Sequence, residues 1–164
     1  MLEGIMMFYS ENVWSSQFNK PAKRCIHWII QVIGSLLALS GILVKYVNNN
    51  GKHFQTIHST IGLISGIFLL ISLCSGIIAL KSFALRKIVR PALVKFFHYI
   101  SGTMAILLGL VALYYGYDKK FMQANSDGQI RLCLQLIAGS TAIFSLIGAL
   151  QSFYRGARTI LTNN

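Results

Sequence analysis

Three histidines lie within stretches that contain no Asp, Glu, Lys or Arg: His27, His58 and His98. An imidazole in an apolar setting needs a hydrogen-bond partner or a metal, so such residues are candidates for function. Neutral imidazoles are also common metal ligands. For any one of these histidines, the residue type leaves an interhelical hydrogen bond and metal ligation equally open.

The stretches that hold these histidines are long enough to cross a bilayer. Four charge-free stretches of 20, 27, 22 and 23 residues occupy positions 25–44, 54–80, 96–117 and 132–154. A helix needs about 20 mostly apolar residues to span the hydrocarbon, and barrel strands would be about half as long. The sequence therefore predicts an all-α transmembrane helical bundle in a single domain, 1–164. Its four full crossings are expected at about 25–47, 54–80, 93–117 and 131–154.

The composition excludes an ordinary soluble domain. Hydrophobic residues make up 54% of the 164-residue chain and charged residues 12%, against about 25% charged residues in soluble domains. The net charge of +11 would suggest nucleic-acid binding in a soluble protein, but here the basic residues lie between apolar blocks. The three cysteines, Cys25, Cys74 and Cys133, lack zinc-site or disulfide spacing and are interpreted as small apolar residues.

The basic residues divide unequally between the two sides that four crossings define. Connectors 1–24, 81–95 and 155–164 carry ten Lys and Arg residues, and connectors 45–53 and 118–131 carry five. Cytoplasmic connectors of membrane proteins carry the excess of Lys and Arg. We therefore predict a multi-pass membrane protein with both termini in the cytoplasm, in contact with lipid and with no nucleic-acid partner.

The first nine residues are apolar apart from Glu3 and are too short to span a bilayer. They are typical of the last turns of a helix, and we expect a short N-terminal helical remnant here. A short segment at the membrane interface is the equally open alternative.

The histidines fall at two depths. His27 lies three residues after Arg24 and His98 three residues after Lys95, each at the cytoplasmic start of its helix. His58 lies at the opposite end of the second crossing, about 20 Å away along the membrane normal at the standard helical rise. Two imidazoles at equal depth suit the axial positions of a haem iron. Zinc fits less well, because no third or fourth ligand falls at that depth.

Small residues share the helix faces that carry these histidines. In the third crossing, His98 shares one stripe with five small residues: Gly102, Ala105, Gly109, Ala112 and Gly116. Ordinary small-residue helix packing accounts for such a stripe by itself. Joined to the histidines, the stripe favours a flat macrocycle lying against glycine.

Three basic residues precede His27, namely Lys20, Lys23 and Arg24. They are topology determinants in the simplest interpretation, and they also form a positive rim that would attract a small anionic reductant. His53 lies in the connector before the second crossing. It is interpreted as a solvated loop histidine, with a contact to an anionic or metal-bearing acceptor as the alternative.

Together these features resemble the cytochrome b561 family, in particular its short vesicle-type, domain-only branch. The residues that carry the resemblance are Lys23-Arg24-Cys25-Ile26-His27-Trp28, Gly51-Lys52-His53-Phe54 followed by His58, and Lys95-Phe96-Phe97-His98-Tyr99-Ile100-Ser101-Gly102. The resemblance covers the chain from Met1 to about Arg158. It implies a six-helix bundle with two b-type haems, each held by two histidines from alternate helices of the central four.

The resemblance also implies an activity and a place in the cell. Family members pass electrons from cytosolic ascorbate across the membrane to monodehydroascorbate or ferric chelates, and the vesicle-type branch favours an endomembrane over the plasma membrane. His27 and His98 match the ligands of the cytoplasmic haem, and His58 matches one ligand of the far-side haem. The region of the family's cytoplasmic substrate contacts holds Lys20, Lys23 and Arg24.

The resemblance has one departure, which concerns the far-side haem. In the family, the partner of His58 comes from near the start of the second helix, whereas Leu2-Glu3-Gly4-Ile5 resembles the late part of that helix. We therefore expect one fully ligated haem b, at His27 and His98. It stays open whether this chain alone transfers electrons across the membrane and whether it pairs with itself.

Two other functions fit the same residues. One is a non-enzymatic membrane scaffold or assembly protein whose histidines are hydrogen-bonded to neighbouring hydroxyls. The other is a transporter or proton channel that uses the histidines as a relay. The relay is disfavoured because no carboxylate accompanies the histidines inside the membrane.

Overall fold

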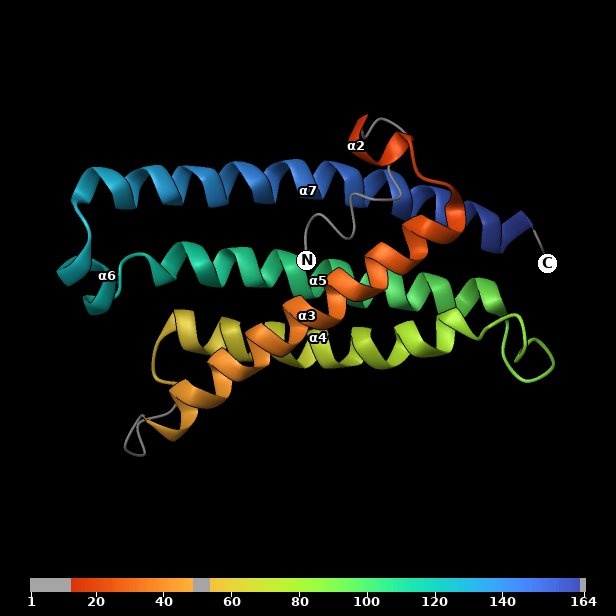
Figure 1. The fold of residues 1–164 in the computed structure, drawn as a ribbon, viewed down its shortest axis with the longest axis horizontal. Coiled ribbons are helices and arrows are strands. Elements are labelled where there is room, and N and C mark those ends of the chain that lie inside the picture. The colour runs from red at the N-terminus through yellow and green to blue at the C-terminus, as the bar shows by residue number, and fades with distance from the viewer. Residues whose placement is uncertain (1–12, 49–53, 163–164) are drawn as a thin grey trace. The chain divides into compact units, whose positions relative to one another are not determined.

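The computed structural model describes residues 13–48 and 54–162 (Figure 1). Every regular element among these residues is a helix. The chain divides into two compact units, Met1–Asn50 and Gly51–Asn164, and each is described by itself. The helical remnant predicted at residues 1–9 lies outside the described residues.

The first unit contains the short helix α2 (Val13–Ser16) and the long helix α3 (Lys20–Val47). Asn19 caps α3, because its side-chain oxygen accepts a hydrogen bond of 2.9 Å from the backbone N–H of Ala22. A proline in the first turn of α3 fits a position where no intrahelical donor is needed. These signals start the helix at Lys20, ahead of the charge-free stretch that begins at Cys25.

The second unit begins with a sharp turn into α4 (Ile57–Leu80). Phe54 takes the left-handed backbone conformation with φ 55°, and its carbonyl accepts a 3.0 Å hydrogen bond from the Thr60 hydroxyl. Thr56 and Ser59 form a reciprocal capping box at the start of the helix. The cap fixes the first turn of α4, where His58 lies.

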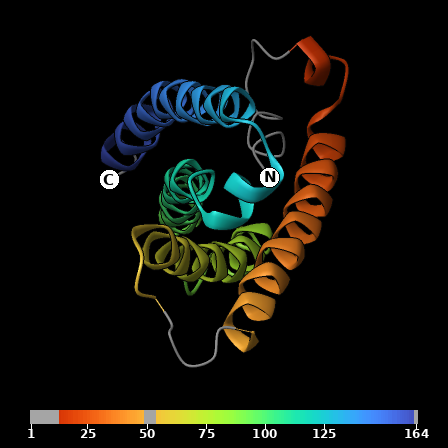
Figure 2. The same cartoon turned by 90° about the vertical axis from the view of Figure 1, so that its left-hand side faces the viewer.

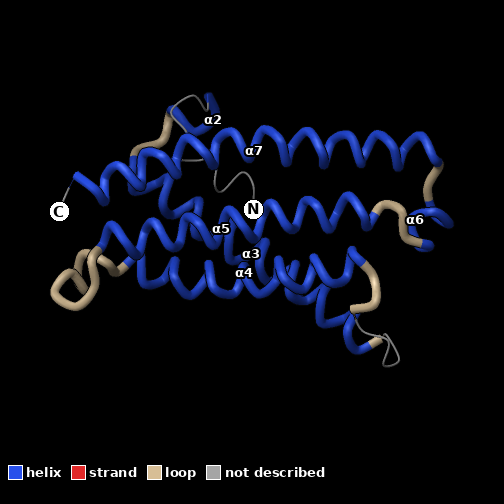
Figure 3. Tube along the Cα trace, turned by 180° about the vertical axis from the view of Figure 1, so that it is seen from behind, coloured by secondary structure: helices blue, strands red, loops and turns tan. Residues whose placement is uncertain are grey.

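Two further long helices complete this unit. Helix α5 (Pro91–Gly116) begins at a proline, and helix α7 (Gly128–Thr162) follows the short helix α6 (Lys120–Asn125). Viewed end-on, α5 lies between α4 and α7 (Figure 2). The α4–α5 connector and the α6 region lie at opposite ends of these helices (Figure 3).

Small side chains form the contact between α4 and α5. A Cβ atom added at Gly109 would lie 3.1 Å from the Ser65 hydroxyl, and one added at Gly102 would lie 3.1 Å from the Ser72 hydroxyl. Ser65 also donates a 2.7 Å hydrogen bond to the Ala105 carbonyl. The α5 stripe of small residues therefore packs against α4. The prediction that it lies against a macrocycle is wrong for Gly102 and Gly109.

Large apolar side chains point away from the helix contacts. On α7, for example, Leu136 and Phe144 are 65% and 73% exposed. In the described part of the chain, four helices are long and apolar enough to cross a membrane: Lys20–Val47, Ile57–Leu80, Pro91–Gly116 and Gly128–Gln151. The predicted all-α fold with four membrane-spanning helices is confirmed.

Candidate functional site

His58 packs against the far end of α5. Its Nδ1 atom lies 2.7 Å from the carbonyl oxygen of Ala112. One turn further along α5, a Cβ atom added at Gly116 would lie 3.0 Å from the ring carbon Cε1. The imidazole therefore rests on a glycine and is hydrogen-bonded to the backbone of the neighbouring helix. We refer to these three residues as the His58 site.

His98 has the corresponding arrangement at the other end of the helix pair. Its Nδ1 atom lies 3.0 Å from the carbonyl oxygen of Ser72, and the hydroxyl of Ser75 lies 3.3 Å from the same nitrogen. A Cβ atom added at Gly76 would lie 2.9 Å from Cε1. We refer to His98, Ser72 and Gly76 as the His98 site.

The carbonyl partners determine which ring nitrogen can bind a metal. A carbonyl oxygen only accepts hydrogen bonds, so the neutral ring carries its proton on Nδ1 and its lone pair on Nε2. Metal-ligating histidines almost always donate their other N–H to a carboxylate, a backbone carbonyl or water, which fixes the ring and raises its basicity. Both His58 and His98 have this second interaction in place.

The two sites lie at opposite ends of α4 and α5. Fourteen residues separate His98 from Ala112, the partner of His58, which corresponds to about 21 Å along the helix axis. A group bound at one histidine would therefore not contact the other. The two histidines were expected at different depths, because each lies near the start of its helix and the two helices run antiparallel.

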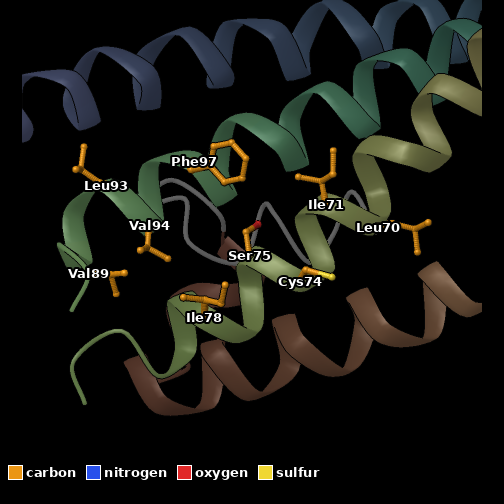
Figure 4. A pocket seen from close by; sticks show the side chains of 9 residues that line it. All are labelled: Leu70, Ile71, Cys74, Ser75, Ile78, Val89, Leu93, Val94 and Phe97. Atoms are coloured by element: carbon orange, nitrogen blue, oxygen red, sulfur yellow. The ribbon is translucent and has the colours of Figure 1, made fainter. Parts of the chain in front are cut away.

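An apolar groove adjoins the His98 site (Figure 4). Its volume is about 590 Å³, and it is lined by Leu70, Ile71, Cys74, Ser75, Ile78, Val89, Leu93, Val94 and Phe97. Ser75 belongs to this lining and is also within 3.3 Å of His98 Nδ1. The groove thus provides an apolar surface beside an oriented imidazole.

His27 lies in the other unit, in the second turn of α3. The residues Lys20, Lys23, Arg24 and His27 follow the i, i+3, i+4, i+7 pattern and so share one helix face. The ammonium group of Lys23 lies 3.5 Å from the Ser15 hydroxyl, and Lys20 and Arg24 are exposed. The pairing of His27 with His98 joins the two units and stays a prediction. His53 lies outside the described residues.

The available side chains limit the kind of metal group that could bind. Within residues 13–48 and 54–162, no three His, Cys, Asp or Glu side chains are grouped so that they could hold a metal ion. A metal bound at His98 therefore needs most of its ligands from elsewhere. Haem meets this requirement, because the porphyrin supplies four nitrogens and the protein supplies only the axial ligands. The donor chemistry of His98 fits haem.

A family model described as eukaryotic cytochrome b561 matches residues 1–124. The chain belongs to that family. It is similar to the mouse protein named transmembrane reductase CYB561D2, with 28% identity over 131 residues, 78% of this chain and 59% of the mouse protein. The human and bovine proteins of the same name are 27% and 26% identical, over 78% and 79% of this chain and 59% and 60% of their own lengths.

The chain thus spans about three fifths of the length of the curated relatives it matches. No solved structure matches it. Family membership and the four apolar helices identify it as an integral, multi-pass membrane protein.

The sequence did not predict which residues of α4 hold the His98 ring. Ser72, Ser75 and Gly76 were not predicted, although a signal for Ser72 exists. His58, Ser65 and Ser72 follow each other at intervals of seven residues, as do His98, Ala105 and Ala112 on α5. Seven residues are about two helical turns, so each set lies along one face, and the two faces pack together.

Proposed function

We propose that this member of the cytochrome b561 family is a haem-b electron-transfer protein, an ascorbate-dependent reductase of monodehydroascorbate or ferric chelates. The observation that carries the proposal is the hydrogen bond between His98 Nδ1 and the Ser72 carbonyl, which would place the ligating lone pair on Nε2. The relatives named transmembrane reductases support an oxidoreductase of this kind. When bound, haem b supplies a one-electron couple at its iron.

The protein's own residues would hold and orient this group. His27 and His98 would hold the haem iron on the cytoplasmic side, with the Ser72 carbonyl fixing the His98 ring. His58 would be one ligand of a second haem on the far side.

The cytoplasmic end of α3 would receive the reductant. Ascorbate is an anion at neutral pH, and Lys20, Lys23 and Arg24 place three positive charges on the helix face that carries His27. On the far side, His53 would contact the acceptor. We place the protein in a vesicle or other endomembrane, with both termini in the cytoplasm.

The proposal is tested by the absorption spectrum of the purified protein in detergent. We expect a b-type band in the reduced-minus-oxidised difference spectrum, with reduction by ascorbate as well as by dithionite. His27→Ala should remove the band of the cytoplasmic haem, whereas Gln31→Ala, one turn further along the same helix, should keep it. A colourless wild-type protein, or a band unchanged in His27→Ala, would contradict the proposal.

A scaffold without redox activity is the second candidate, because both histidines already have partners within the helix pair. In a scaffold the imidazole serves only as a hydrogen-bond donor, and a glutamine amide can replace it. The scaffold therefore predicts that His98→Gln is fully functional. In a haem protein His98→Gln should lose the cytoplasmic band, because an amide is a poor axial ligand.

The sidedness of the chain gives a separate prediction. Phe83 in the α4–α5 connector and Phe121 in α6 are both 74% exposed, at opposite ends of the second unit. In a background where the three native cysteines are serine, Phe83→Cys and Phe121→Cys are matched reporters. With sealed vesicles whose cytoplasmic side faces out, an impermeant maleimide should label Phe83→Cys and spare Phe121→Cys. The reverse labelling would invert the proposed orientation.

A further inference from the structure

The His58 and His98 sites have the same design. In each, the histidine Nδ1 faces a carbonyl of the neighbouring helix, and the ring rests on the glycine one turn after that carbonyl. The carbonyl and glycine are Ala112 and Gly116 for His58. They are Ser72 and Gly76 for His98.

The repeat is visible in the spacing along each helix. Gly76 follows His58 by eighteen residues on α4, and Gly116 follows His98 by eighteen residues on α5. Eighteen residues make five full turns at 3.6 residues per turn. Each helix therefore presents its histidine and its glycine on one face. Because α4 and α5 run antiparallel, each imidazole lies against the glycine of the other helix.

The glycines leave no room for a larger residue. The Cβ of an alanine would lie 2.9 Å from His98 Cε1 at Gly76, and 3.0 Å from His58 Cε1 at Gly116. Carbon atoms in contact prefer separations of about 3.5–4.0 Å. An added methyl group must therefore displace the ring, which lengthens the Nδ1–carbonyl hydrogen bond.

We infer that Gly76 and Gly116 are positioning residues, which hold the imidazoles of His98 and His58 against the carbonyls that set their tautomer. As far as it concerns haem, this inference rests on the proposed function. Loss of such an outer interaction typically lowers metal affinity by about 10- to 100-fold. We expect Gly76→Ala to weaken haem binding at the His98 site by that factor.

Gly62 provides a matched control on the same helix. An alanine there would place its Cβ 3.9 Å from the Ala112 Cβ, an ordinary contact. The test compares Gly76→Ala and Gly62→Ala in two measurements. One is titration of the apoprotein with haem, and the other is the ¹⁵N NMR spectrum of the histidine rings in the apoprotein, which reports the tautomer without any haem.

The expected result is a 10- to 100-fold loss of haem affinity in Gly76→Ala, together with a changed Nδ1–H signal of His98, while Gly62→Ala matches the wild type. Gly116→Ala should change the His58 ring signal in the same way. A Gly76→Ala protein that matches Gly62→Ala in both measurements would overturn the inference. A changed ring signal in a protein that never binds haem would support the positioning role and refute the proposed function.

A double variant keeps the inference testable if Gly76→Ala destabilises the protein. If the added methyl group acts through the His98 ring, then Gly76→Ala should cost less stability in a His98→Ala background than in the wild type, because the ring that collides with the methyl group is gone. Double-mutant cycles isolate such a pairwise effect. Strict additivity of the two substitutions would overturn the inference.

Discussion

His98→Ala is expected to lose the b-type band of the cytoplasmic haem completely, and added imidazole is expected to restore it. The wild-type ring occupies a defined space between Gly76 and the Ser72 carbonyl. Truncation to alanine empties that space without removing the carbonyl acceptor. Free imidazole can donate one N–H to that carbonyl and ligate through its other nitrogen, as the side chain would.

Two comparisons make this prediction specific. His98→Ala/Gly76→Ala should resist rescue by imidazole, because the new methyl group fills part of the emptied space. His58→Ala, about 21 Å away along the helix pair, should leave the cytoplasmic band in place. The measurement is the difference spectrum with and without imidazole at millimolar concentration. A full band in His98→Ala without imidazole would show that another residue ligates the iron.

The lengths of the apolar stretches were enough to predict the four long helices, but they did not predict where α3 begins or where α7 ends. α3 begins at Lys20 and α7 continues to Thr162, because charged residues can extend a helix beyond the hydrocarbon. A charge-free stretch marks the part of a helix that lies in the membrane. The caps at Asn19 and Thr56 set the helix starts by hydrogen bonding.

The surroundings of the histidines were less predictable. Periodicity showed that Gly102 and Gly109 share a face with His98, but it could not show what covers that face. In the structure α4 covers it, with Ser72 and Ser65 against the two glycines. The same limit applies to His27, because helix periodicity does not reveal which residue faces it.

Gly109→Leu is expected to separate α4 from α5. Even the first carbon of the new side chain would lie 3.1 Å from the Ser65 hydroxyl, which is held by its hydrogen bond to Ala105. Overpacking of this kind costs about 1–3 kcal/mol. Helix separation would also weaken the hydrogen bonds of His58 and His98 to the neighbouring helix, each contributing about 1 kcal/mol. We expect a total loss of about 3 kcal/mol, and haem binding should fall with it.

Gly139→Leu on α7 is the matched control, because no atom of the described chain lies within 4 Å of a Cβ added there. The free energy of unfolding can be measured for both variants by circular dichroism during titration with a denaturing detergent. A loss of 3 kcal/mol corresponds to a change of about 100-fold in the unfolding equilibrium. Equal stability of the two variants would mean that close contact between α4 and α5 at Gly109 does not hold the helices together. Tight packing of α4 against α5 would then not explain the geometry of the two histidine sites.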